Sequence, residues 1–441
     1  MSNNNKVDID AILKSQNFEK LNPMQQEVFA LDKSVQDVIL LSPTGSGKTL
    51  AYLLRLLSVL KADTGHVQAL IISPTRELVI QIETVFRSLK TGYSSCICYG
   101  GHDSRTEQNR LSEKPDVIIG TPGRLVDHIL KGRIDLSKLS MVILDEFDKS
   151  LEMGFLEEIE LIFKNIKAKP DHVLTSATNL EKIPSFIPIR KEVRLNYLSN
   201  ATESKLELLL INCPAEEKAE AVMNLVTNFG DELSLIFCNH RDAVERISLC
   251  FKELGLQHGI FHGGLEQIDR ERNLIKFRTG ACNVLISTDL AARGLDIPEI
   301  KNVIHYQLPI HEDAFIHRNG RTARMNASGQ SYLLLGSDEE LPQYIQRNLK
   351  TFKLEPSIVK PKQTGFECVY FSAGKKDKIS KGDVVGLLMK KGGLENNDIG
   401  LITITDIATY VGVNRQKVNS LIKVLKGEKL KKAKVKIEIA R

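Results

Sequence analysis

Residues 42–49 read Ser-Pro-Thr-Gly-Ser-Gly-Lys-Thr and stand between an apolar run at 38–41 and a helix-like segment that begins near Leu50. A glycine-rich loop between a buried strand and a helix lets backbone N–H groups surround phosphate oxygens. Lys48 can neutralise the β and γ phosphates of a nucleotide, and the Thr49 hydroxyl can bind Mg²⁺. An ordinary glycine turn is the alternative. The loop predicts a nucleotide site that includes Pro43, Thr44, Gly45, Ser46, Gly47, Lys48 and Thr49.

Outward from this loop, short apolar runs alternate with segments of helical period. Runs that are apolar on both faces are typical of a parallel sheet covered by helices on both sides. A polar stretch at 199–204 separates two such series, so we predict two α/β domains. The runs are at 38–41, 70–72, 117–119, 142–144 and 173–174, and then at 235–238, 260–261, 284–286, 303–304 and 333–335.

A small third unit is expected at the C-terminal end. A helical segment is predicted after residue 340, and the prolines and glycine between 355 and 365 predict a linker. The later pattern has a β-α-β-β-α-β order, which is the split plan of RNA-recognition modules. Tyr370, Phe371 and Tyr410 lie on its strands and could stack bases or fill the core. We place the domains at 1–200, 201–355 and 367–441, with a linker at 356–366.

The charge is unevenly distributed. The chain has 441 residues and a formal net charge of only +5, yet residues 375–441 carry 16 Lys and Arg against 7 Asp and Glu. Residues 1–374 carry 44 basic against 48 acidic residues. The basic character of the third unit therefore predicts a polyanion partner such as nucleic acid.

The remaining composition limits the class of protein. Apolar residues make up 42% and charged residues 26%, which excludes wholesale disorder. The seven cysteines are an odd number with no CxxC pair, so neither a disulfide framework nor a zinc site is predicted. The start of the chain lacks the pattern of a signal peptide, and no long apolar run is present. We expect a cytoplasmic, soluble monomer that does not bind membranes.

Two further segments carry chemical groups suited to nucleotide hydrolysis. Asp145 and Glu146 follow the apolar run 142–144, where Asp145 can hold a metal ion through water and Glu146 can orient the attacking water. Solvated turn residues are the alternative. Arg321 and Arg324 lie in a segment with arginines at spacings of three, which suits charge stabilisation on a transferred phosphate. A basic helix face on the surface is the alternative there.

Together these segments resemble the DEAD-box RNA helicases. The matching segments, in family order, are 17–25 (the Q motif), 42–49 (motif I), 74–78 (Ia), 100–101 (the paired glycines), 121–124 (Ib), 145–148 (II), 176–178 (III), 235–239 (IV), 288–296 (V) and 317–324 (VI).

The resemblance implies two RecA-like domains that close around ATP, Mg²⁺ and single-stranded RNA. It implies that Gln25 hydrogen-bonds adenine, that Phe18 stacks near the base and that Asp296 contacts the ribose. The implied catalytic residues are Lys48, Asp145, Glu146, Arg321 and Arg324, with Thr49 and Asp145 at the metal and Ser176 and Thr178 coupling hydrolysis to RNA binding. The implied RNA-binding residues are Thr75, Arg76, Gly101, Thr121, Arg124, Arg270, Thr288 and Gly294.

The chain departs from the family pattern at several positions. Phe147 replaces the usual alanine of motif II, and it either fills a gap in the core or alters the coupling to motif III. Asn22 replaces a usual threonine and Asn319 a usual apolar residue. None of these changes removes a charged catalytic group, so we expect an active ATPase.

The third unit resembles the RNA-binding domain of DbpA-type helicases in segments 372–379, 381–386, 398–400 and 430–441. The family uses this domain to bind a hairpin of large-subunit ribosomal RNA, which implies local unwinding of short RNA duplexes during ribosome assembly. Leu430 to Lys432 depart from the family's Ile-Lys-Gly segment. A general RNA-remodelling enzyme, a non-catalytic RNA clamp and a DNA helicase are the alternatives.

Overall fold

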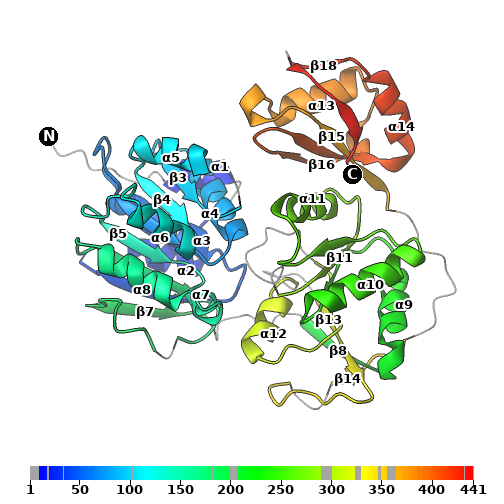
Figure 1. Cartoon of the computed structure of the whole chain (residues 1–441), viewed down its shortest axis with the longest axis horizontal. Coiled ribbons are helices and arrows are strands. Elements are labelled where there is room, and N and C mark those ends of the chain that lie inside the picture. Colours follow the sequence, from blue (N-terminus) through cyan, green and yellow to red (C-terminus); the bar gives the residue numbers. More distant parts are fainter. Residues whose placement is uncertain are drawn as a thin grey trace. The chain divides into compact units, whose positions relative to one another are not determined.

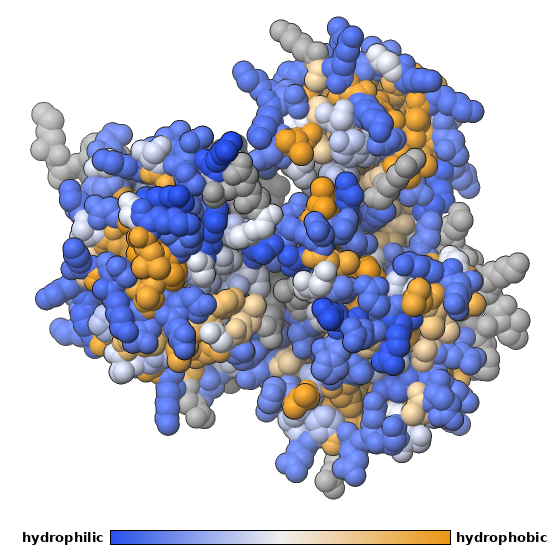
Figure 2. Space-filling model, viewed as in Figure 1, coloured by the Kyte–Doolittle hydropathy of each residue, from blue (hydrophilic) through white to orange (hydrophobic). Residues whose placement is uncertain are grey.

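The structure is a computed structural model (Figure 1). It describes residues 9–16, 19–32, 34–101, 104–180, 182–198, 206–289, 300–322, 329–345, 349–354, 364–431 and 433–440. The first sheet and its helices form one compact unit, and the second sheet forms another unit with the C-terminal domain. In this described part of the chain, no helix is long and apolar enough to cross a bilayer. The face shown in Figure 2 is largely hydrophilic, with hydrophobic residues in separate groups.

The first domain contains a parallel sheet in the order β3-β4-β2-β5-β6-β1-β7. All five predicted apolar runs are strands of this sheet. The edge strands β3 and β7 were not predicted, because they are partly exposed and lack a continuous apolar run. The strands are β1 (Asp37–Leu41), β2 (Ala69–Ile72), β3 (Ser95–Cys98), β4 (Val117–Gly120), β5 (Met141–Leu144), β6 (Asp171–Ser176) and β7 (Glu192–Asn196).

Helices cover both faces of this sheet (Figure 1). Along β1, Val38 and Leu40 pack with α3 and α4, whereas Ile39 and Leu41 belong to the core that contains α6 and α8. Burial of successive strand residues on opposite faces explains the uninterrupted apolar runs. The helices are α1 (Ile9–Gln16), α2 (Pro23–Ala30), α3 (Lys48–Val59), α4 (Arg76–Ser88), α5 (Ser104–Ser112), α6 (Pro122–Leu130), α7 (Phe147–Glu152) and α8 (Leu156–Asn165).

The second domain repeats this architecture, with a parallel sheet in the order β10-β11-β9-β12-β13-β8-β14. The two parallel sheets confirm the predicted tandem RecA-like fold class. The strands are β8 (Leu206–Cys213), β9 (Ser234–Phe237), β10 (Gly259–Phe261), β11 (Val284–Ser287), β12 (Asn302–His305), β13 (Gly329–Gly336) and β14 (Lys350–Thr351). The helices are α9 (Lys218–Phe229), α10 (Arg241–Glu253), α11 (Gln267–Arg278) and α12 (Glu312–Asn319), with a short 3₁₀ turn at Ala215–Glu217.

The helix expected after residue 340 is not found in the described residues that follow. Residues 341–345 form turns and irregular backbone, and 350–351 pair with β8 as the edge strand β14. Pro342 cannot donate a helical hydrogen bond. The prediction of a helix was therefore wrong for these residues.

The third domain has an antiparallel sheet in the order β16-β17-β15-β20, packed on two helices. This arrangement agrees with the predicted β-α-β-β-α-β plan. Its elements are β15 (Phe366–Phe371), α13 (Lys381–Lys390), β16 (Ile399–Ile404), β17 (Thr409–Asn414), α14 (Arg415–Val424), the hairpin β18 (Lys429–Leu430) with β19 (Ala433–Lys434), β20 (Ile437–Ile439), and short 3₁₀ turns at Lys375–Asp377 and Asn396–Asp398.

The second face of this sheet packs against the second domain near α11. Cys368 and Tyr410 pack with Ile275 and Ala281, so this part of the sheet face is covered. Phe371 is fully buried in the core of the third domain, which makes the base-stacking prediction wrong for that residue. Arg415 links the two domains, because its Nη2 donates to Gln257 Oε1 at 2.8 Å.

Candidate nucleotide and RNA sites

The carboxyl edge of the first sheet brings the predicted site segments together in two groups. Parallel strands end at the same edge of their sheet, so the loops that follow them are neighbours. The neighbouring strands β5, β6 and β1 are followed by motif II, motif III and the 42–49 loop. The neighbouring strands β3, β4 and β2 are followed by the paired glycines and motifs Ib and Ia. The first group contains residues predicted to bind the nucleotide, and we call it the nucleotide group. The second group contains residues predicted to bind RNA, and we call it the RNA group.

The 42–49 loop leads from β1 into α3, as the sequence predicted. Gly45 and Gly47 have φ angles of +78° and +88°, which glycine adopts without strain. Lys48 is buried at the start of α3, and its Nζ donates to the carbonyl oxygens of Ser42 at 2.5 Å and Pro43 at 2.9 Å. The ammonium group is therefore held over the loop in which a phosphate chain would lie.

The Q motif supports this loop from the side. Asn22 caps α2 and its Nδ2 donates to Ser46 O at 2.9 Å, while Gln25 Nε2 donates to Gly47 O at 3.3 Å. Asn22 thus provides both the helix cap and a donor to the loop, and it does so with two separate atoms of its amide, Oδ1 and Nδ2. The adenine contact of Gln25 stays a prediction, and Phe18 lies outside the described residues.

Motif II places a buried carboxylate beside the loop lysine. Thr175 Oγ1 donates to Asp145 Oδ1 at 2.8 Å and accepts from the Glu146 N–H at 3.1 Å. Burial raises the pKa of Asp145, and the Thr175 hydrogen bond and the Lys48 charge oppose that rise. Sequence reasoning missed Thr175, although the pairing of β5 with β6 puts it next to Asp145.

Tyr52 is a second residue of this site that sequence reasoning missed. It lies one helical turn after Thr49, and its fully buried hydroxyl has no hydrogen-bond partner among the described residues. Burial raises the pKa of Tyr52 well above its ordinary value, and the charges of Asp145 and Glu146 contribute to the rise. The phenol is therefore a neutral donor beside the predicted metal ligands. The helical spacing from Thr49 is the signal that could have identified it.

Motifs II and III are hydrogen-bonded to each other. Asp148 Oδ2 accepts from Thr178 Oγ1 at 3.0 Å and from the Ala177 N–H at 3.2 Å, and Ser176 Oγ donates to Thr178 O at 2.6 Å. A displacement of the segment after β5 would therefore be transmitted to the segment after β6. Phe147 is fully buried in the apolar core below motif II, as the core-filling interpretation of this departure requires.

The RNA group is built on helix starts and a close glycine contact. Thr75 caps α4 by accepting from the Leu78 N–H at 3.3 Å. A Cβ on Gly101 would lie 2.3 Å from Arg76 Nη1, so only glycine allows the guanidinium to lie against this backbone. Thr121 starts α6 without a capping bond from its side chain, and Arg124 follows in the first turn of the same helix.

In the second domain, Arg318 connects three motifs. Its guanidinium is fully buried and donates to Asp289 Oδ1 at 2.5 Å, Asn239 Oδ1 at 2.7 Å and Gln307 O at 2.7 Å. The sequence did not distinguish Arg318 from the arginines that follow it. Arg321 and Arg270 are also largely buried, and Thr288 directly follows β11. The predicted residues Arg324, Asp296 and Gly294 lie outside the described part of the chain.

The departure at Asn319 has a local explanation. Its Oδ1 accepts from His305 Nε2 at 3.1 Å and from Ser331 Oγ at 2.7 Å. These groups are all buried, and burial lowers the pKa of His305 to about 3. Asn319 therefore satisfies polar groups that an apolar residue would leave unpaired.

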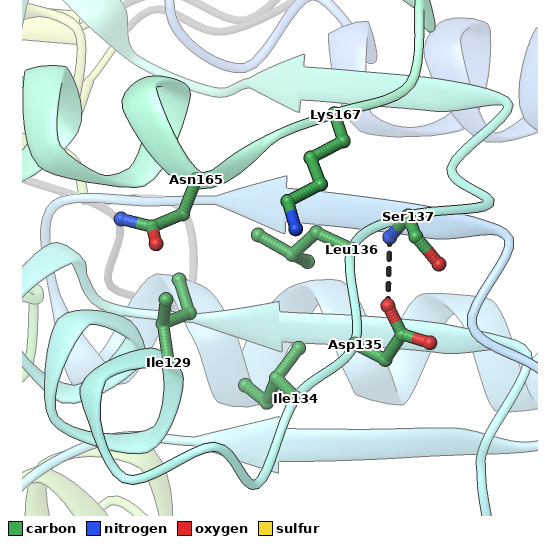
Figure 3. Close-up of a pocket in the computed structure, with 7 residues that line it drawn as sticks. All are labelled: Ile129, Ile134, Asp135, Leu136, Ser137, Asn165 and Lys167. Carbon is green, nitrogen blue, oxygen red and sulfur yellow. Dashed lines mark hydrogen bonds between the residues drawn. The ribbon is translucent and has the colours of Figure 1, made fainter.

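A cavity of about 190 Å³ lies elsewhere in the first domain (Figure 3). It contains none of the predicted site residues, and Ser137 N donates to Asp135 Oδ1 at 2.9 Å at its rim. The lining residues are Ile129, Ile134, Asp135, Leu136, Ser137, Asn165 and Lys167.

Comparison with known proteins finds three family matches along the chain. Residues 22–184 match the DEAD/DEAH box helicase family, residues 217–326 match the helicase conserved C-terminal domain, and residues 368–439 match the DbpA RNA binding domain. The chain therefore belongs to the DEAD-box ATP-dependent RNA helicases, within the group that carries a DbpA-type RNA-binding domain.

Two relatives match the chain over almost the whole length of both proteins. The chain is 30% identical to ATP-dependent RNA helicase DbpA of Bacillus subtilis, over 98% of this chain and 97% of the relative. It is also 30% identical to the Escherichia coli DbpA, over 93% and 92% of the two chains. The structure is similar to S. cerevisiae Dbp5 bound to RNA and ADP BeF3, with a TM-score of 0.67, 26% identity and coverage of 74% of this chain and 88% of that chain.

Proposed function

We propose that this RNA helicase unwinds short duplexes in large-subunit ribosomal RNA during ribosome assembly in the cytoplasm. The observation that carries the proposal is the match to the DbpA RNA binding domain at 368–439, which follows the two helicase-domain matches at 22–184 and 217–326. The excess of basic residues in this domain supports an RNA partner. Because part of the sheet face is covered, we propose that RNA binds at the lysine segment. This segment is defined by the exposed residues Lys375, Lys376 and Lys378.

In the first domain, we propose that Lys48 neutralises phosphate charge and that Glu146 orients the attacking water. Lys48 already lies over the loop, and Glu146 lies beside Asp145 at the same sheet edge. The proposed role of Arg321 and Arg324 is to stabilise the charge on the transferred phosphate. The bonds from Asp148 to motif III support coupling through Ser176 and Thr178.

The residues fit Mg²⁺, which binds oxygen ligands. Thr49 offers a hydroxyl, and Asp145 is a buried carboxylate whose desolvation a cation would offset. When bound, Mg²⁺ would neutralise charge on the β and γ phosphates. The hydrogen bond from Thr175 Oγ1 fixes the orientation of the Asp145 carboxylate.

Crosslinking the full chain to RNA in cells, followed by sequencing of the bound fragments, tests the proposed target. We expect fragments of large-subunit ribosomal RNA to dominate. Replacing Lys375, Lys376 and Lys378 by alanine should remove that enrichment, because these exposed lysines are proposed to contact phosphates.

The matched control replaces Lys164, Lys167 and Lys169 by alanine, since these lysines are also exposed and lie in the first domain. This variant should retain the enrichment. Reads spread evenly over cellular RNA would contradict the ribosomal target and favour general RNA remodelling. Equal loss in both triple variants would show that only total charge matters.

A further inference from the structure

A buried carboxylate accepts several hydrogen bonds from residues in or next to the RNA group of the first domain. Glu107 lies in the first turn of α5 and is 2% exposed. Its Oε2 accepts from Arg124 Nε at 2.7 Å and from His128 Nε2 at 2.6 Å, while its Oε1 accepts from the Tyr99 N–H at 3.0 Å. One side chain thus ties the segment after β3 to the first two turns of α6.

Only an ionised carboxylate matches this set of donors. Both of its oxygens accept, whereas a glutamine side chain presents one oxygen and one N–H₂ group. Whichever way a glutamine were turned, its N–H₂ would face the Tyr99 N–H or the Arg124 Nε–H. Burial alone would raise the pKa of Glu107, but the bonds from His128, Arg124 and Tyr99 outweigh it and hold the pKa below its ordinary value.

Glu107 holds Arg124 at its Nε, and part of the Arg124 side chain stays exposed. Its side chain is 18% exposed, and Nη1 lies 3.7 Å from Asp127 Oδ2. Its Nη2 is buried and has no hydrogen-bond partner among the described residues. A phosphate oxygen would therefore have to approach the exposed part of the Arg124 side chain, which the bond to Glu107 holds in place.

The neighbouring thiol does not turn this cluster into a metal site. Ligand atoms of Cys98, Glu107 and His128 lie within 4.8 Å of one another. The Cys96 hydrogen bond and burial raise the pKa of Cys98, so its thiol stays protonated. The guanidinium bonded to Glu107 would also repel a metal cation. The geometry favours an arginine support over a cation ligand set.

We propose that Glu107 is a positioning residue that fixes the Arg124 guanidinium for contact with the RNA backbone. The inference rests on the proposed RNA-binding role of Arg124. His128 completes the support, because its hydrogen bond prevents the carboxylate from turning away from Arg124. An arginine that is already ordered loses less side-chain entropy when it binds phosphate.

The test measures binding of a fluorescent single-stranded oligouridylate by the full chain, with Mg²⁺ and a non-hydrolysable ATP analogue. Arg124→Ala should weaken RNA binding by roughly tenfold and Glu107→Gln by roughly fivefold. The double variant should bind no more weakly than Arg124→Ala, because Glu107 acts through Arg124. In RNA-stimulated hydrolysis, Glu107→Gln should raise the KM for RNA and change kcat little.

The matched control is Glu113→Gln, which makes the same charge change at an exposed position just after α5. It should bind RNA as the unaltered chain does. Unchanged binding by Arg124→Ala would show that the proposed RNA contact itself is wrong. Weak binding by Arg124→Ala together with normal binding by Glu107→Gln, or a further loss in the double variant, would overturn the positioning role alone.

Thermal unfolding shows whether Glu107→Gln retains the fold. Should that variant fail to fold, Arg124→Lys tests the proposal, because it keeps the charge and removes the Nε–H that Glu107 holds. We expect a loss of RNA affinity of roughly fivefold for this variant as well. Full affinity would show that charge alone is sufficient and would overturn the positioning role.

Discussion

The two parallel sheets share one strand order, yet their carboxyl edges differ in chemistry. The strands β1 and β8 occupy the same place in their sheets, and each leads into a helix that begins with a lysine. Lys48 follows a glycine-rich loop and donates to loop carbonyls, whereas Lys218 donates to the Glu339 carboxylate at 2.6 Å. The fold supplies the edge, and the residues of the loop decide whether the lysine is available to a phosphate.

This pair gives the largest expected effect. Lys48→Ala should reduce ATP hydrolysis by roughly a thousandfold, because it removes the cation that stabilises the developing phosphate charge. Lys218→Ala should leave hydrolysis intact and lower the free energy of unfolding by about 1 kcal/mol, because it removes a partly exposed ion pair. Steady-state hydrolysis and thermal unfolding measure the two outcomes. Equal losses of hydrolysis would contradict the distinction between the domains.

A smaller effect is expected at the turn of the phosphate loop. Gly47→Ala places a Cβ 2.5 Å from Gln25 Nε2 at a φ of +88°. We expect ATP affinity to fall by roughly tenfold, as measured with a fluorescent nucleotide, because the Gln25 amide must move away and lose its hydrogen bond to the Gly47 carbonyl. Gly65→Ala is the control, since Gly65 has a φ of +64° with no atom within 4 Å of the added Cβ. A comparable loss for Gly65→Ala would point to a general loss of stability.

The smallest effect concerns the polar core of the second domain. Asn319→Leu should lower the free energy of unfolding by about 1 kcal/mol, because it leaves His305 and Ser331 without their acceptor. Chemical unfolding followed by circular dichroism measures the change. An increase in stability would show that this network is not needed to satisfy buried groups.

Much of the fold could be predicted because the central strands are apolar on both faces. Edge strands such as β7 were not predicted, because Val193 and Leu195 alternate with exposed residues and form no continuous apolar run. The packing of Cys368 and Tyr410 on the second domain was not predicted either, because the sequence does not show which distant surface covers a strand.

The site could be predicted where chemistry lies in contiguous motifs. Lys48, Asp145 and Thr178 are recognised by their loops and strand ends. Glu107 was missed, because it lies in the polar helix α5 and its role depends on contacts with Arg124 and His128 of α6. Its acceptor role needs the three-dimensional arrangement of α5 and α6.

The most direct test of the account is ATP hydrolysis by the full chain with Mg²⁺, measured with and without RNA. We expect RNA to increase turnover several-fold, since the resemblance to DEAD-box helicases implies that the two domains close only around ATP and RNA together. The Lys48→Ala variant provides the background rate. Turnover with RNA that is no faster than this background would contradict the account and make the protein a non-catalytic RNA clamp.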